Sequence, residues 1–339
     1  MPAIRIIGPP KRIDYHRKRQ EFITPGTSRR GAGPNGHVVT AGGKARDKLR
    51  EAHARKRRTC AGGKNTGKIV LVIRETFVTT PGGRTRVLEA GAGWPVVLLH
   101  AFPLSADMWR PQLERVADGW RLVAPDLRGL GEGAAAPAGT TSIDDLAAGV
   151  EAVLDALRIE TAAIGGLSMG GYVTFALFRR SPARFNAVVL ADTKASADTP
   201  EGREGRQKML DLVRREGPAA VANQMIPKLL GETSRRDRPQ LEEPVRQMIE
   251  ANHSEGIAGA IEAMLNRPDS TPLLARMSCP VLIIVGSEDT LTPPVESEAM
   301  QQRMERSRLV VLPAAGHLSN LETPDAFSQA LADFLASNL

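Results

Sequence analysis

The chain has 339 residues, of which 42% are hydrophobic and 24% are charged, as in an ordinary soluble globular protein. This composition excludes a collagen-like, a wholly disordered or a membrane-embedded chain, and no apolar run approaches the roughly 20 residues of a membrane-spanning helix. Two cysteines, Cys60 and Cys279, are too few for a disulfide framework. We therefore expect a reducing, cytoplasmic location and no membrane partner.

The net charge of +7 conceals two segments of opposite sign. Residues 1–68 contain 18 Lys and Arg against 4 Asp and Glu, whereas the other 271 residues contain 27 basic and 34 acidic side chains. Only 9 of the first 68 residues are Leu, Ile, Val or Phe, too few to offset the entropy of ordering the chain. We predict that residues 1–68 are a basic, disordered extension. A tether to nucleic acid or an anionic surface, and an organelle transit peptide, remain alternatives.

Residues 69–339 alternate short apolar runs with amphipathic stretches. The runs 96–99 and 281–285 are apolar at every position, which is typical of strands covered on both faces of a parallel sheet. This alternation predicts an α/β fold with a doubly wound, mostly parallel, eight-stranded sheet. The expected strands are 69–78, 84–90, 95–100, 120–125, 161–166, 185–191, 280–286 and 309–313. The expected helices between them are 107–117, 142–157, 169–180, 294–304 and 324–335.

The alternation is interrupted between about residues 193 and 277. This stretch is charged and helical in pattern, with expected helices at 204–216, 219–230 and 242–250. Because 85 residues are too many for a connection between two strands, we predict a helical cap over one end of the sheet. The domain organisation expected is thus an extension at 1–68 and one domain at 69–339 that carries the cap.

A Gly-x-Ser-x-Gly sequence at residues 166–171 lies between an expected strand and an expected helix. A sharp turn there lifts the hydroxyl of Ser168 out of the sheet. A serine hydroxyl is a weak nucleophile unless a base takes its proton. Of His100, His253 and His317, the last follows the final strand in a loop of small residues. We predict that His317 is the general base.

The base needs a carboxylate that orients its ring. Asp289 follows the apolar strand at 280–286, so it emerges at the same sheet edge as Ser168. Asp192 and Glu288 remain alternatives for this carboxylate. The resulting order along the chain is Ser168, Asp289, His317.

This order on a parallel sheet, together with the blocks at 98–103, 124–129, 166–171, 286–294 and 315–317, resembles the α/β-hydrolase fold family across residues 69–339. Within the family the chain is most similar to small carboxylesterases and 3-oxoadipate enol-lactonase-like hydrolases. The resemblance implies an oxyanion hole made by the backbone N–H groups of Phe102 and Met169. Ala101 replaces the usual Gly of this loop, so the loop requires a negative φ at Ala101.

The resemblance implies a serine hydrolase that cleaves small carboxylic esters or lactones through an acyl-enzyme intermediate. The same triad could serve a cofactor-free perhydrolase or haloperoxidase, or a C–C bond hydrolase. A different class of function is a protein tethered to nucleic acid through its basic first segment. The expected partners are the ester or lactone and water.

We expect Phe102, Trp109, Leu167 and Leu291, with residues of the cap, to line the substrate pocket. Aromatic and apolar side chains near the expected catalytic loops are suited to an acyl or alcohol group. No cluster of His, Cys or Asp has the spacing of a metal site. The sequence therefore predicts neither a metal nor another cofactor.

Overall fold

The computed structural model describes residues 5–7, 72–115, 119–132 and 142–339. The predicted extension at 1–68 lies outside these ranges except for three residues, so its disorder and its possible partners stay predictions. Those three residues form strand β1 (Arg5–Ile7), which we did not predict. It pairs antiparallel with β9 (Ser307–Leu312), some 300 residues later in the chain.

A nine-stranded sheet forms the centre of the fold, and all eight predicted strands are part of it. The sheet order is β1-β9-β8-β7-β6-β4-β5-β3-β2. Strands β4 to β9 are parallel, whereas β1, β2 and β3 pair antiparallel with their neighbours. The predicted doubly wound, mostly parallel sheet is confirmed, with β1 as an additional edge strand. The remaining bounds are β2 (Arg74–Thr80), β3 (Gly83–Gly91), β4 (Trp94–Leu99), β5 (Trp120–Pro125), β6 (Ala162–Leu167), β7 (Phe185–Ala191) and β8 (Val281–Gly286).

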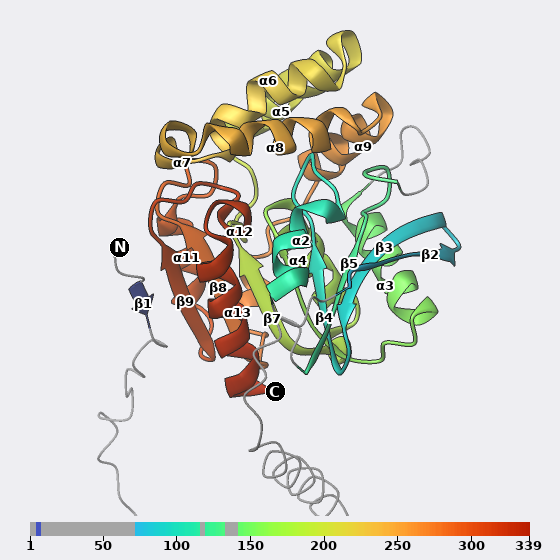
Figure 1. Ribbon diagram of the computed structural model, residues 1–339, viewed down its shortest axis with the longest axis vertical. Helices are drawn as coiled ribbons and strands as arrows, with labels where there is room; N and C mark the ends of the chain where they lie inside the picture. The colour runs from blue at the N-terminus through green and yellow to red at the C-terminus, as the bar shows by residue number, and fades with distance from the viewer. Residues whose placement is uncertain (1–4, 8–71, 116–118, 133–141) are drawn as a thin grey trace, which may run out of the picture. The chain divides into compact units, whose positions relative to one another are not determined.

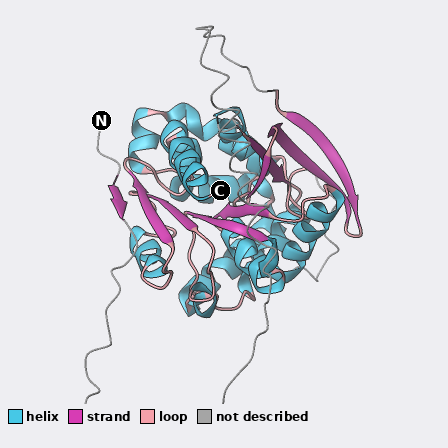
Figure 2. Cartoon of the chain, turned by 90° about the horizontal axis from the view of Figure 1, so that it is seen from below, coloured by secondary structure: helices cyan, strands magenta, loops and turns pink. Residues whose placement is uncertain are grey.

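Helices cover both faces of this sheet (Figure 2). Helix α2 packs against α13, and α3 packs against α4. The start of α3 is fixed by a capping box, in which Ser142 Oγ accepts from Asp145 N at 3.0 Å and the Asp145 carboxylate accepts from Ser142 N at 2.9 Å. The helices of the sheet layers are η1 (Ala106–Trp109), α2 (Arg110–Arg115), α3 (Ile143–Ala156), α4 (Met169–Arg180), η2 (Pro182–Arg184), α11 (Pro294–Gln301), α12 (Ser319–Glu322) and α13 (Pro324–Asn338).

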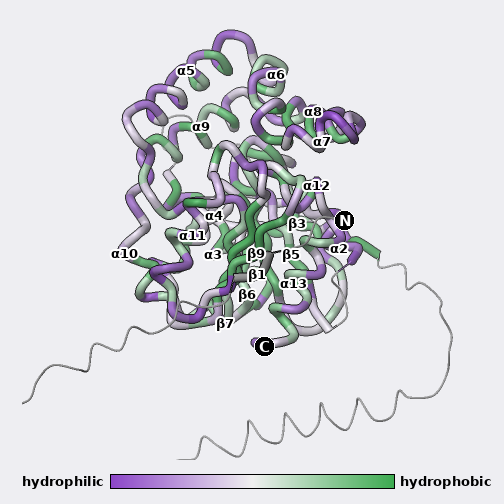
Figure 3. The backbone as a smooth tube through the Cα atoms, turned by 90° about the vertical axis from the view of Figure 1, so that its left-hand side faces the viewer, coloured by the Kyte–Doolittle hydropathy of each residue, from purple (hydrophilic) through white to green (hydrophobic). Residues whose placement is uncertain are grey.

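The core lies where the central strands meet these helices. All six residues of β8 are buried, as are the last four residues of β4. The strands are also the most hydrophobic part of the backbone trace (Figure 3). Burial on both faces is therefore the reason that these strands read as unbroken apolar runs.

A group of helices between β7 and β8 gathers at one end of the sheet (Figure 1). We call residues 193–277 the cap. Helix α5 packs against α6 and α9, and α6 packs against α8. The residues from Leu71 to Leu339 lie in one compact unit, while the domain boundaries at 69, 193 and 277 stay predictions. The cap helices are α5 (Pro200–Glu216), α6 (Pro218–Leu229), α7 (Glu232–Asp237), η3 (Pro239–Leu241), α8 (Glu242–Glu250), α9 (Ser254–Leu265) and α10 (Thr271–Leu274).

None of the helices in the described ranges is long and apolar enough to cross a membrane.

Candidate active site

The carboxyl ends of five neighbouring parallel strands meet at the edge of the sheet that faces the cap (Figure 1). In parallel α/β sheets this edge is where side chains from different strands converge on a ligand. Residues singled out from the sequence follow β4, β6, β7, β8 and β9 there, the one after β4 for its backbone N–H group. They are Phe102, Ser168, Asp192, Asp289 and His317.

Ser168 occupies a strained turn between β6 and α4. Its backbone has φ 55° and ψ −113°, a conformation that non-glycine residues adopt only where the surroundings enforce it. The surroundings are tight, because a Cβ on Gly170 would lie 2.2 Å from Leu99 O and one on Gly166 would lie 2.4 Å from the carbonyl carbon of Gly170. The N–H of Ser168 donates to Ala191 O at 2.9 Å. The glycines are thus required for the close approach that exposes this serine.

The structure brings Ser168, His317 and Asp289 into one hydrogen-bonded line. His317 Nε2 lies 2.8 Å from Ser168 Oγ, and His317 Nδ1 lies 2.8 Å from Asp289 Oδ2. The carboxylate also accepts from Leu291 N at 2.8 Å, Thr292 N at 3.0 Å and Thr292 Oγ1 at 2.7 Å. Burial alone would raise the pKa of Asp289, but the charge of His317 and these hydrogen bonds lower it below its ordinary value. Asp289 is therefore held ionised beside the imidazole.

The two alternative carboxylates have other partners. Glu288 accepts from the backbone N–H of Thr233 at 2.9 Å. Asp192 is completely buried, and it accepts from Gly286 N at 2.8 Å and from the hydroxyl of Ser319. Burial and the nearby negative charge of Asp289 raise the pKa of Asp192 well above its ordinary value. Of the three candidates, Asp289 is the one that contacts the histidine.

Replacing Asp192 with Asn tests this upward shift in the pKa of Asp192. Because the folded protein holds the Asp192 proton more firmly than the unfolded chain does, wild-type stability should fall as pH rises above about 4, the ordinary carboxyl pKa. Asn does not titrate, so the stability of the variant does not fall with pH for this reason. Asn also tolerates the positive φ of 41° at this position. The melting temperature of Asp192→Asn relative to wild type should therefore increase between pH 4 and pH 7. A constant difference across this range contradicts the assignment.

The loop after β4 places Phe102 beside this line of side chains. Ala101 is not among the residues with positive φ, which meets the requirement drawn from the sequence. His100 Nδ1 lies 2.9 Å from Ala101 O, and its Nε2 accepts from Leu127 N at 2.8 Å. Burial lowers the pKa of His100, so this ring is neutral and joins two loops. Among the hydrogen bonds of the described residues, none uses the N–H of Phe102 or Met169.

The other histidine considered from sequence, His253, lies in the cap. It precedes α9 as the N-cap residue and has no side-chain capping bond. The cavity at Ser168 contains His317 among its lining residues but neither His100 nor His253. Of these three histidines, His317 is the one that contacts Ser168.

Asp126 supports the loop after β4 from behind. It accepts from Ala106 N and Glu132 N, each at 2.8 Å, and from Arg86 Nε at 2.9 Å. Arg86 Nη1 lies 3.2 Å from the carboxylate of Glu132. These contacts give Asp126 a structural role.

A cavity of about 360 Å³ opens onto Ser168 and His317. Its walls come from α4, from the loops of Phe102, Asp289 and His317, and from the helices α5, α6 and α9. Phe102 and Leu291 line it as predicted. Further lining residues that sequence reasoning did not single out are Tyr172, Lys194, Asp198, Gly202, Gly205, Arg206, Lys208, Met209, Gln224, Met225, Lys228, Ile261, Met264 and Thr292.

Two of the predicted lining residues were wrong. Trp109 is fully buried and packs against Phe327, with ring centroids 5.8 Å apart. Leu167 is fully buried as the last residue of β6. Neither lines the cavity, because both side chains fill the core behind the loops. Tyr172, which does line it, could have been found from its position one helical turn after Ser168.

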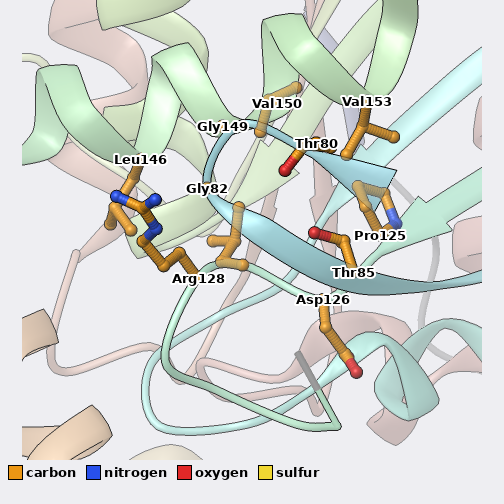
Figure 4. A pocket seen from close by; sticks show the side chains of 11 residues that line it. Thr80, Gly82, Thr85, Pro125, Asp126, Arg128, Leu146, Gly149, Val150 and Val153 are labelled. Carbon is orange, nitrogen blue, oxygen red and sulfur yellow. The ribbon is translucent and has the colours of Figure 1, made fainter. Parts of the chain in front are cut away.

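A second hollow lies at the β2–β3 turn beside α3 (Figure 4). Its volume is about 20 Å³, which is room for roughly one water molecule. It is lined by residues such as Thr80, Arg128 and Val150 and does not include Ser168. Within the described ranges, no group of three His, Cys, Asp or Glu residues is placed to hold a metal ion. The cavity at Ser168 is therefore the candidate site.

Comparisons with known proteins agree with this fold. Residues 95–324 match the model of the alpha/beta hydrolase fold family. The chain is 31% identical over 236 residues to 3-oxoadipate enol-lactonase 2 of Acinetobacter baylyi, covering 70% of this chain and 86% of that protein. Among solved structures, a thermophilic esterase from Thermogutta terrifontis is 40% identical with a TM-score of 0.74, covering 78% of this chain and 98% of that one. The enol-lactonase from Burkholderia xenovorans LB400 is 29% identical with a TM-score of 0.72, covering 77% and 100%. The chain belongs to the α/β-hydrolase fold family.

Proposed function

We propose that the protein is a serine hydrolase that cleaves small carboxylic esters or lactones through an acyl-enzyme intermediate. The observation that carries the proposal is the hydrogen-bonded line from Ser168 Oγ through His317 to Asp289, with a distance of 2.8 Å at each of the two contacts, at the wall of the cavity. The similar proteins named as an esterase and as enol-lactonases support the same substrate class.

The proposed reaction begins when Ser168 Oγ attacks the substrate carbonyl and His317 Nε2 takes its proton. Asp289 keeps the proton of His317 on Nδ1, so that Nε2 is free to accept. The N–H groups of Phe102 and Met169 stabilise the oxyanion, each worth roughly 3–4 kcal/mol in comparable sites. The imidazolium then protonates the leaving alcohol. Water deprotonated by His317 attacks the acyl group, releasing the acid and restoring Ser168.

The test is a panel of p-nitrophenyl esters and small lactones, combined with labelling by a fluorophosphonate. We expect hydrolysis of short-chain members and a single adduct, located at Ser168 by peptide mass spectrometry. Halide-dependent oxidation driven by peroxide and cleavage of C–C bonds are assayed in parallel, since these reactions would use the same side chains. The proposal fails if no ester or lactone is hydrolysed and Ser168 stays unlabelled.

The charge of the cavity predicts a preference for substrates that carry a carboxylate. Lys194, Arg206, Lys208 and Lys228 line it against one acidic residue, Asp198. Burial would raise the pKa of Asp198, but the bonded Arg206 and the nearby Arg267 lower it, so it stays ionised. Lys194 Nζ lies 3.4 Å from the same carboxylate, and Lys208 Nζ lies 2.7 Å from the carboxylate of Glu204. The four basic side chains thus still outnumber these two carboxylates.

A p-nitrophenyl monoester of succinic acid should therefore have a KM about tenfold lower than p-nitrophenyl butyrate, since partly exposed ion pairs each contribute about 1 kcal/mol. The difference should shrink in high salt and in a Lys194→Met variant. Steady-state kinetics with both esters measures it. Equal KM values at low salt would rule out this preference.

A further inference from the structure

The carboxylate of Glu322 binds the backbone on both sides of His317. Glu322 is the last residue of α12 and is completely buried. Its Oε1 accepts from the N–H of Gly316 at 2.9 Å and from that of Leu318 at 3.2 Å. One oxygen atom thus fixes the two peptide groups next to the histidine.

The other oxygen of Glu322 binds the cap. Its Oε2 accepts from Gly231 N at 2.8 Å. We call residues 229–233, where α6 ends and α7 begins, the cap junction. Packing here is tight, because a Cβ on Gly231 would lie 2.8 Å from Gly316 N. The N–H of Leu318 also donates to Leu229 O at 3.1 Å. The histidine loop and the cap junction are therefore in direct backbone contact.

The loop of Asp289 is fixed to the same junction. Glu288, the preceding residue, accepts from Thr233 N at 2.9 Å. Its own N–H donates to Ala315 O at 2.8 Å, which joins the loop of Asp289 to that of His317. The carboxylates of Glu322 and Glu288 thus hold both proposed catalytic loops against one segment of the cap.

We propose that Glu322 is a positioning residue, which holds the His317 loop against the cap junction so that Nε2 stays within bonding distance of Ser168 Oγ. This inference rests on the proposed function. A carboxylate offers acceptor sites on both oxygens, whereas the amide nitrogen of Gln accepts no hydrogen bond. A Gln at this position leaves at least one buried N–H without an acceptor and shifts the loop. Displacement by about 1 Å at such a site can lower the rate by roughly 100-fold.

The first experiment compares Glu322→Gln with wild type in steady-state ester hydrolysis. We expect kcat to fall by roughly 10- to 100-fold, with KM changed by less than about twofold because Glu322 does not line the cavity. Glu89→Gln is the matched control. Glu89 lies on β3, away from β8 and β9 in the sheet order, and its largely buried carboxylate accepts from Arg121 Nε at 2.7 Å. Thermal melts of both variants separate lost stability from lost turnover. A folded Glu322→Gln protein with wild-type kcat overturns the inference.

A second variant disturbs the same contact from the cap. Gly231 has φ −62°, so Ala fits its backbone, but the added methyl group meets Gly316 N. Gly231→Ala should also lower kcat more than it raises KM. If Glu322→Gln fails to fold, this variant decides the matter, and an unchanged kcat overturns the inference.

Proton NMR provides a readout that does not depend on turnover. The Nδ1 proton of His317, held by Asp289, should resonate far downfield in wild type and should shift or broaden in Glu322→Gln. An unchanged resonance in the variant contradicts the positioning role. If the wild type shows this resonance but hydrolyses no ester, the proposed function is wrong and not the positioning role. The two failures are therefore distinguishable.

Discussion

Replacing Ser168 with Ala is expected to abolish ester hydrolysis, with kcat lowered by roughly 10⁴- to 10⁶-fold. The variant lacks the oxygen that forms the acyl-enzyme, whereas His317 and Asp289 keep their mutual hydrogen bond at 2.8 Å. Residual activity would come from the oxyanion donors and the cavity, which still bind and polarise a carbonyl. Hydrolysis of p-nitrophenyl acetate, with the enzyme concentration set by absorbance, measures the loss.

The control is Ser328→Ala. Ser328 is a buried serine on α13, and its hydroxyl has no hydrogen-bond partner among the described residues. Its removal should leave kcat and KM unchanged. Both variants should melt close to wild type. If Ser168→Ala and wild type hydrolyse the ester at equal rates, Ser168 is not the nucleophile and the proposed mechanism is wrong.

Much of the fold could be predicted because the signals are local. Short segments of sequence carry them: the unbroken apolar runs at β4 and β8, and the Gly-x-Ser-x-Gly turn at Ser168. None of these patterns depends on a contact with a distant part of the chain. The edge at which Asp289 and His317 would emerge followed from the direction of parallel strands. Local patterns therefore placed all eight strands and identified which residues the sheet could bring together.

Other features depend on contacts that no local pattern encodes. Strand β1 pairs with β9 across almost the whole chain, and three residues are too short a run to predict a strand from the sequence. Trp109 was expected at the pocket because it follows the loop of Phe102, but residue type does not say which way a side chain points. Glu322 meets Gly231 across 91 residues of sequence, and this contact appears only when the cap is folded.

The cap shows why these missed contacts matter for function. Asn252, just before α9, donates to Pro103 O at 2.9 Å and accepts from Gly131 N at 2.7 Å. It therefore holds the peptide that follows Pro103, one residue after Phe102, as the cap junction holds the loop of His317. The cap supplies lining residues and also fixes the loops whose N–H groups and imidazole are proposed to act. Movement of the cap would alter both substrate access and catalytic geometry.

Replacing Asp289 with Asn is expected to lower kcat by roughly 10⁴-fold. An Asn side chain in this position can present its NH₂ group to Nδ1, which then accepts, so the ring proton moves to Nε2. Nε2 then donates toward Ser168 Oγ and is unable to take the serine proton. The carboxylate charge that stabilises the imidazolium is lost as well. Ester hydrolysis between pH 6 and pH 9 measures the effect, and fluorophosphonate labelling of Ser168 should slow in parallel.

Asp192→Asn is the matched control for this prediction, because both residues are buried carboxyls that follow strands at the same edge. Burial and the charge of Asp289 raise the pKa of Asp192 well above its ordinary value, and an amide has nearly the size and shape of the carboxyl group that it replaces. Its activity should stay within about threefold of wild type, a small change compared with the loss of a group that contacts the reacting atoms. If Asp192→Asn loses as much activity as Asp289→Asn, the two carboxyls act as one unit and the assignment of Asp289 alone is wrong. Only the carboxylate in contact with the imidazole can set its tautomer, so the geometry predicts that the two variants differ by about three orders of magnitude.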